Sequence, residues 1–233
     1  MFKDTIPGLD GIFKTDTESP KVVLVTGPPG SLKTSFCYDI MTKFLAERND
    51  FGVYLTLEEE KKSQIKNMED LGVDLVNNIH ISDLTDLREI DEIIEEDEDT
   101  DYVEFIEDLL KNFRNEKGDD FTIFAIDSLG ALYSLMEDTE NIRKRMFSFF
   151  KLLRDLNLYC FVVMERSPGG EANLLGDEGF LVDGVINLGI DRKSGKLTRY
   201  IQVEKMRACN HSMEKHALEV GKNGLNVLGP LFE

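Results

Sequence analysis

Hydrophobic residues follow two different periods along the chain, and the alternation of these periods predicts a succession of strands and helices. Apolar runs typical of buried strands lie at 22–26, 52–57, 121–126 and 158–164, and a further short strand is predicted at 78–82. Between these runs, apolar residues recur every three or four positions, as in helices with one buried face. The recurring segments are a helix that begins near residue 33 and segments 61–71, 86–116 and 139–156. Strands that alternate with helices are typical of an α/β fold.

The pattern changes after residue 184, where only strands are predicted. Their positions are 185–190, 197–204, 216–220 and 225–228. The short segments 192–196 and 221–224 contain glycine and polar residues, which is typical of hairpin turns. Strands joined by hairpin turns are antiparallel, so we expect the C-terminal end of the sheet to be antiparallel.

A glycine-containing turn lies between the first predicted strand and the first long helix. Its residues are Gly27, Pro28, Pro29, Gly30, Ser31, Leu32, Lys33, Thr34 and Ser35. A tight turn at this place directs backbone N–H groups and a helix N-terminus at one anion, as in a nucleotide-phosphate cradle. In such a cradle we expect Lys33 to reach the outer phosphates of ATP and the Thr34 hydroxyl to complete the shell of a Mg²⁺ ion.

The turn departs from the usual phosphate-loop pattern at one position. The pattern has glycine immediately before the lysine, whereas this chain has Leu32. The Leu32 side chain either crowds the backbone around the phosphates or points away while its N–H still donates. We expect the tight turns to depend on Gly27 and Gly30. An ordinary glycine turn before a helix is the alternative interpretation of the segment.

Acidic residues follow two of the predicted buried strands. Asp127 ends the strand 121–126, and in a phosphate-binding enzyme it would hold Mg²⁺ through water. Glu58 and Glu59 follow the strand 52–57, where one of them would orient or deprotonate the water that attacks the γ-phosphate. Alternatively, these glutamates begin the next helix, where the helix dipole favours negative charge.

A second acidic segment, 95–101, interrupts the helical period within 86–116. Six of its seven residues are carboxylates. It lacks the alternating ligands and central glycine of a calcium loop, so we interpret it as a solvated bend. Asp101 and Glu104 have the spacing of a capping box, which predicts that a helix begins there.

Length, charge and cysteine content narrow the classes of protein to consider. The 233 residues suffice for one domain over 1–233. The formal charge of −18, without clustered cations, disfavours nucleic acid as a partner. Cys37, Cys160 and Cys209 are far apart and odd in number, which favours neither disulfides nor a metal site. No apolar run reaches the length of a signal peptide or a membrane span, so we expect a cytoplasmic protein.

Taken together, these segments resemble the KaiC-like branch of the RecA-fold ATPases over nearly the whole chain. The resemblance is seen in Ile6–Asp10, Gly52–Glu59, Asp127-Ser128, Asp177–Leu188 and the late series Lys205, Arg207 and His211. It implies a RecA-like P-loop NTPase fold, with a mostly parallel twisted sheet, helices on both faces and antiparallel C-terminal strands. Single-domain relatives occur mostly in archaea, which suggests an archaeal cytoplasm.

The resemblance also implies a homo-oligomer. In that family the late lysine and arginine reach the nucleotide bound by the neighbouring subunit of a ring, usually a hexamer. Lys205 and Arg207 would therefore act in trans, with His211 as a lesser contact. The basic end of a hairpin is the alternative interpretation of these residues.

Three functions are compatible with the sequence. The first is an oligomeric regulator that binds and hydrolyses ATP, with Lys33, Glu58 and Glu59 as catalytic candidates and Thr34 and Asp127 as magnesium ligands. The second is a nucleotide-binding switch or assembly scaffold with little hydrolysis, such as an archaellum motor subunit. The third is a relative of the DNA recombinases, which the acidic charge disfavours. The first two functions imply an unidentified protein partner.

Overall fold

A computed structural model describes residues 2–15, 20–46, 48–87, 101–136, 141–166, 178–193 and 195–231. The predicted acidic bend at 95–101 lies largely outside these residues, and so does the start of the segment 177–188. The helices are η1 (Phe2–Asp4), α1 (Leu9–Ile12), α2 (Lys33–Ala46), α3 (Lys61–Asp70), α5 (Tyr102–Lys117), η2 (Gly118–Asp120), α6 (Leu129–Ser134), α7 (Ile142–Asp155) and α8 (Glu178–Leu181). The strands are β1 (Val22–Gly27), β2 (Phe51–Thr56), β3 (Ile79–Asp83), β4 (Phe121–Asp127), β5 (Tyr159–Glu165), β6 (Gly184–Lys193), β7 (Lys196–Met206), β8 (His216–Gly221) and β9 (Gly224–Pro230).

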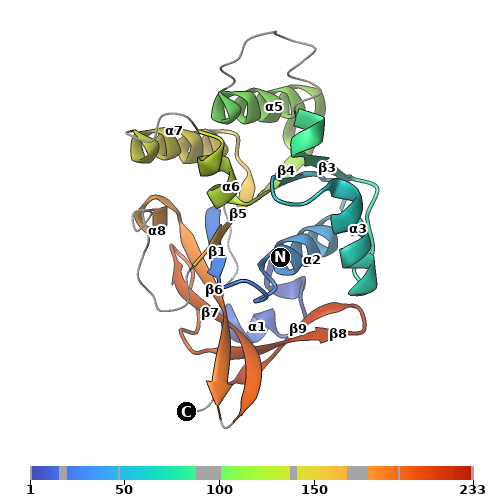
Figure 1. Cartoon of the computed structure of the whole chain (residues 1–233), viewed down its shortest axis with the longest axis vertical. Coiled ribbons are helices and arrows are strands. Elements are labelled where there is room, and N and C mark those ends of the chain that lie inside the picture. The colour runs from blue at the N-terminus through green and yellow to red at the C-terminus, as the bar shows by residue number, and fades with distance from the viewer. Residues whose placement is uncertain are drawn as a thin grey trace.

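The nine strands form one mixed sheet in the order β3-β2-β4-β5-β1-β6-β7-β8-β9 (Figure 1). β1 lies in the interior of the sheet, parallel to both β5 and β6. β2 is likewise parallel to β3 and β4. From β6 onward the pairs are antiparallel. The predicted α/β fold with a mostly parallel sheet and antiparallel C-terminal strands is therefore confirmed.

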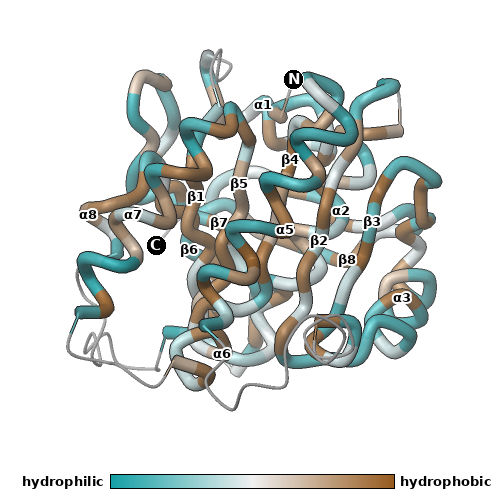
Figure 2. Tube along the Cα trace, turned by 90° about the horizontal axis from the view of Figure 1, so that it is seen from above, coloured by the Kyte–Doolittle hydropathy of each residue, from teal (hydrophilic) through white to brown (hydrophobic). Residues whose placement is uncertain are grey.

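Helices cover both faces of the sheet because successive residues of each buried strand point to opposite sides. In β1, Val23 and Val25 pack in a core with α2 and α3. Val22 and Leu24 pack on the other face with α5, α6 and α7. Hydrophobic segments are accordingly concentrated in the strands between the helices, and hydrophilic segments on the outer turns (Figure 2).

One turn and one helix differ from the sequence prediction. The hairpin between β6 and β7 is tighter than the predicted turn at 192–196, because β6 continues to Lys193 and β7 already begins at Lys196. The short helix α6 was not predicted; it begins after Ser128, whose side-chain oxygen accepts a hydrogen bond from the Ala131 N–H. The predicted start of α5 is confirmed, because Asp101 accepts hydrogen bonds from the backbone N–H groups of residues 103 and 104.

Candidate functional site

The predicted phosphate cradle is the connection between β1, which ends at Gly27, and α2, which begins at Lys33. Gly27 lies so close to β6 that an added Cβ would come within 1.9 Å of the Leu188 carbonyl oxygen. Gly30 has φ of +78°, a left-handed conformation that glycine adopts without strain. Both glycines are therefore required by the backbone path of this turn.

Leu32 also has a left-handed backbone, with φ of +74°. This conformation explains why the phosphate-loop pattern has glycine at this place, since a side chain costs energy there. The Leu32 side chain is partly buried against the core on the α2 side of the sheet. The leucine thus keeps the glycine-like backbone conformation instead of changing it.

Lys33 is the first residue of α2 and is only 8% exposed. Its Nζ donates to the Pro28 carbonyl oxygen at 3.1 Å and lies 3.9 Å from Glu165 at the end of β5. The first N–H groups of a helix have no acceptor within the helix, and they are available to an anion here. The turn therefore presents an ammonium group and backbone donors at the same point.

Asp127 ends β4, beside the cradle, and is 5% exposed. The Tyr54 hydroxyl of β2 donates to its Oδ2 at 3.0 Å. Burial raises the pKa of the Asp127 carboxyl, and hydrogen bonds from the Thr34 and Tyr54 side chains partly oppose this effect. The two predicted magnesium ligands, Thr34 and Asp127, therefore lie together.

Glu58 and Glu59 point in different directions. The Ser128 hydroxyl, next to Asp127, donates to the Glu58 carboxylate. The Glu59 carboxylate instead accepts from Ser63 at 2.6 Å and from Asn67 at 2.5 Å, both on α3. Glu58 thus belongs to the Asp127 side of the site, while Glu59 binds the first turns of α3.

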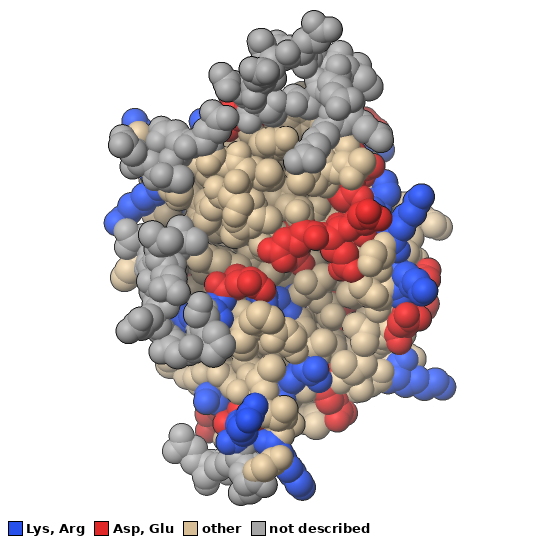
Figure 3. Space-filling view, viewed as in Figure 1, with Lys and Arg blue, Asp and Glu red and all other residues tan. Residues whose placement is uncertain are grey.

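These residues line one cleft of about 510 Å³, within the usual range for small-molecule sites. Its polar lining includes Lys33, Thr34, Glu58, Asp127 and Ser128. Figure 3 shows a band of acidic side chains that crosses the middle of the face seen in Figure 1. A site rich in carboxylates that binds phosphate needs cations, which here are an ammonium group and, with a nucleotide, a metal ion.

The donor set fits magnesium that is bound together with a nucleotide. Within the described part of the chain, no group of three or more His, Cys, Asp or Glu side chains is arranged to hold a metal ion. Magnesium commonly takes one or two protein oxygens and completes its octahedron with water and substrate phosphates. A buried carboxylate beside a threonine hydroxyl is suited to that mode of binding.

Arg199 is a site residue that the sequence did not reveal. It lies on β7, and its Nε donates to the Gly30 carbonyl oxygen at 2.9 Å. The contact exists because β6 and β7 extend past the end of β1, where Thr26 pairs with Asn187. The pairing register of distant strands decides this contact, and no local motif indicates it.

The late basic residues lie far from the cradle of their own chain. The Lys205 ammonium donates to the carbonyl oxygens of Gly179 and Val182, and Arg207 contacts Asp183 at 3.2 Å. The Arg207 N–H donates to the Asp183 carbonyl oxygen, and the Asp183 N–H donates to the carbonyl oxygen of Val22, the first residue of β1. The cradle follows the other end of β1, about 16 Å away along the strand. His211 is also remote, in a β-bridge with Phe13.

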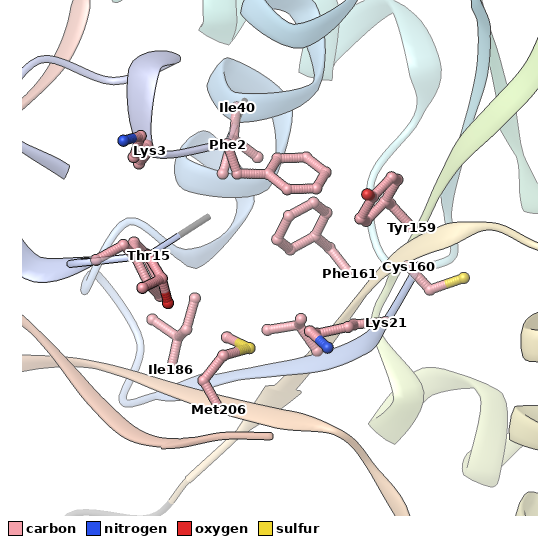
Figure 4. A pocket seen from close by; sticks show the side chains of 12 residues that line it. Phe2, Lys3, Thr15, Lys21, Ile40, Tyr159, Cys160, Phe161, Ile186 and Met206 are labelled. Carbon is pink, nitrogen blue, oxygen red and sulfur yellow. The ribbon is translucent and has the colours of Figure 1, made fainter. Parts of the chain in front are cut away.

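A second cavity is small and mostly apolar. It has a volume of about 30 Å³ and lies among the rings of Phe2, Tyr159 and Phe161, with Met206 and Lys21 nearby (Figure 4). The Phe2 ring is 4.9 Å from that of Phe44 on α2, so the cavity belongs to the packing of the N-terminal segment. It is large enough for about one water molecule and is not a substrate site.

Comparison with known proteins shows the family. Residues 2–231 match the family described as "ATPase: KaiC", and the chain belongs to this family. Membership in an ATPase family implies nucleotide binding. None of the helices that the structure describes has the length and apolar character needed to span a membrane.

Two relatives match this chain over most of their own length. The chain is 28% identical to the UPF0273 protein of Methanopyrus kandleri over 230 residues, with 95% of this chain and 89% of the relative covered. It is 30% identical to the UPF0273 protein of Thermotoga maritima over 236 residues, with 97% and 94% covered.

A longer relative and a solved structure agree with this assignment. The circadian clock protein KaiC3 of Synechocystis is 25% identical over 225 residues, but these span only 44% of that protein. The crystal structure of a KaiC-like protein from Pyrococcus horikoshii superposes with a TM-score of 0.78, at 26% identity and with 97% of each chain covered. The fold is therefore KaiC-like.

Proposed function

We propose that this protein is a single-domain ATPase that binds ATP with Mg²⁺ at the cradle and hydrolyses it. The observation that supports hydrolysis is the convergence of Lys33, Thr34, Glu58 and Asp127 on one cleft. Lys33 and the backbone N–H groups of the turn would bind the phosphates, and Thr34 and Asp127 would hold the metal ion. The bound ion would neutralise negative charge on the phosphates.

Glu58 is the proposed general base for the attacking water. Ser128 holds its carboxylate next to Asp127, on the side of the cleft where a metal-bound γ-phosphate would lie. Glu59 has the same chemistry, but its carboxylate is engaged by Ser63 and Asn67 of α3. We therefore assign Glu59 a structural role at the start of α3.

The test measures nucleotide binding and phosphate release separately. The variants are Lys33→Ala, Glu58→Gln and, as a control, Lys66→Ala on the exposed side of α3. We expect Lys33→Ala to lose nucleotide binding, Glu58→Gln to bind ATP without releasing phosphate, and Lys66→Ala to resemble the wild type. A wild-type protein that binds ATP but releases no phosphate would refute the hydrolase and favour the switch or scaffold.

We further propose a homo-oligomeric ring in which Lys205 and Arg207 act on the nucleotide of the neighbouring subunit. Their distance from the cradle of their own chain supports this, because a catalytic role then requires a second copy. The Arg207 guanidinium would stabilise the charge that develops on the phosphates, as an arginine finger does. His211, in the same connection, would make a lesser contact.

Subunit mixing tests the action in trans. Lys33→Ala subunits have a defective cradle and an intact Arg207, and Arg207→Ala subunits have the reverse. In rings mixed at equal ratio, about a quarter of the interfaces would combine an intact cradle with an intact Arg207. We expect the inactive variants to regain a corresponding share of phosphate release on mixing. No recovery in mixed rings, verified by sizing, would contradict the proposal.

We place the protein in the cytoplasm. Cys37, Cys160 and Cys209 are all free thiols. Thiols remain reduced in that compartment, in contrast to an oxidising one.

A further inference from the structure

A second layer of polar side chains lies behind Asp127, within the core. The Tyr54 hydroxyl donates to Asp127 Oδ2 at 3.0 Å, and Tyr54 is fully buried on β2. Gln64 of α3, which is also fully buried, is a neighbour of the Tyr54 hydroxyl. A polar path thus leads from the cleft, through a β-strand, to a helix on the surface of the domain.

Gln64 is unusual because its amide has no conventional partner. Neither its oxygen nor its nitrogen makes a hydrogen bond within the part of the chain that the structure describes. The amide nevertheless lies beside the Tyr54 hydroxyl. Buried polar groups without partners are rare in native proteins, so each one requires an explanation.

Tyr54 can serve Asp127 only as a donor. The phenol supplies the proton of this contact, and an ionised carboxylate has acceptor oxygens only. The Tyr54 ring is fixed by an edge contact with Tyr38, whose centroid is 5.6 Å away. The donor therefore has a constant position and direction relative to the carboxylate.

We propose that Tyr54, supported by Gln64, is a positioning residue that fixes the orientation of the Asp127 carboxylate for magnesium in the nucleotide complex. The inference is built on the proposed function, since it assigns Asp127 to the metal. A carboxylate at the end of a strand rotates about two bonds, and a hydrogen bond to one oxygen selects one rotamer. Tyr54 does not reach the nucleotide itself, because it is buried behind the aspartate.

The chain offers a matched control for this role. Tyr38 is 1% exposed, lies in ring contact with Tyr54 and makes no hydrogen bond to Asp127. Tyr54→Phe and Tyr38→Phe therefore remove the same hydroxyl group from neighbouring buried rings. Only Tyr54→Phe removes the donor to the carboxylate.

The experiment measures binding of a fluorescent ADP analogue, with Mg²⁺ and with EDTA, and the Mg²⁺ concentration that gives half-maximal binding enhancement. We expect Tyr54→Phe to leave affinity in EDTA unchanged and to raise the half-maximal Mg²⁺ concentration about tenfold, as for other groups that support a metal ligand. Tyr38→Phe should match the wild type in both measurements. Equal shifts in the two variants, or an equal loss of affinity in EDTA, would overturn the inference.

Gln64→Met supplies a second, independent measurement. Methionine has a similar length and no polar group, so it removes an amide without partners from the core. We expect this variant to unfold at higher urea concentration than the wild type and yet to require several-fold more Mg²⁺. Higher stability with unchanged Mg²⁺ dependence would exclude Gln64 from the role. If the wild type binds the analogue but Mg²⁺ dependence is the same in all variants, only this inference fails; no binding by the wild type refutes the proposed function as well.

Discussion

The left-handed backbone at Leu32 leads to a prediction in which the usual ranking of two substitutions is reversed. At an ordinary position, replacement by alanine leaves a protein more stable than replacement by glycine, because glycine has more freedom in the unfolded chain. At φ of +74°, alanine keeps the steric strain of leucine and glycine removes it. We therefore expect Leu32→Gly to be more stable than Leu32→Ala.

The magnitude follows from two opposing contributions. The left-handed conformation costs a residue with a Cβ about 1 to 2 kcal/mol. Glycine loses about 0.4 to 1 kcal/mol relative to alanine through the entropy of the unfolded chain. The difference favours Leu32→Gly by about 0.5 to 1 kcal/mol, or about 2 °C in Tm for a chain of this length. Both variants lose the partly buried leucine side chain, so that loss cancels in the comparison.

The assay is urea unfolding followed by circular dichroism, with Leu75 as the reference position. Leu75 lies outside regular secondary structure, is 45% exposed and has no left-handed backbone. There we expect the ordinary order, with Leu75→Ala more stable than Leu75→Gly by about 0.5 kcal/mol. If the pair at Leu32 shows the same order as the pair at Leu75, the backbone at this position is not left-handed in solution and the reasoning is wrong.

Three further predictions concern neighbouring features. Glu58→Gln should lower kcat for ATP hydrolysis by about 100-fold or more. Glu59→Gln should lower kcat by less than about tenfold and should lower the free energy of unfolding by about 1 kcal/mol. Equal losses of kcat in the two variants would contradict the separate roles. Arg199→Ala should weaken ATP binding about fivefold, while Lys196→Ala, at the start of the same strand, should not; titration with a fluorescent nucleotide decides. Burial raises the pKa of the Asp183 carboxyl, but the hydrogen bonds that it accepts from two arginines and a backbone N–H lower the pKa by more than burial raises it. The pKa of Asp183 is therefore below its ordinary value. The stabilisation is therefore present at neutral pH and is lost only as pH falls through the lowered pKa. Asp183→Asn should cost about 2 kcal/mol at pH 7, and in urea unfolding this cost should begin to decrease only below about pH 4 and continue to decrease on further acidification.

The sequence predicts most of the fold because the strands of the sheet's parallel part are buried on both faces. Runs such as 121–126 and 158–164 are apolar at nearly every position, which is the signal of such strands. The ends of β6 and β7 were harder to predict, because there the strands extend beyond the helices and carry polar residues. The helix α6 was missed because it has only six residues, too few for a helical period.

The candidate site is predictable only where its residues are close in sequence. The cradle is a continuous segment, and Asp127 directly follows a strand, so both are visible as patterns. The Arg199 contact depends on the register of β6 and β7 and has no local signature. The sequence gives a weak indication that Gln64 is buried, because Gln64 lies four residues before Met68 and therefore on the same apolar face of α3.

The interior position of β1 also determines when the cradle can form during synthesis. The hydrogen bond between Gly30 and Arg199 cannot form until the ribosome has added Arg199, 169 residues after Gly30. At typical translation rates this interval is roughly 10 to 30 seconds, during which the segment has been made but its neighbours in the sheet have not. A nucleotide therefore cannot protect the nascent chain through the complete site, and we expect ATP to influence this protein only after the β6–β7 hairpin has left the ribosome.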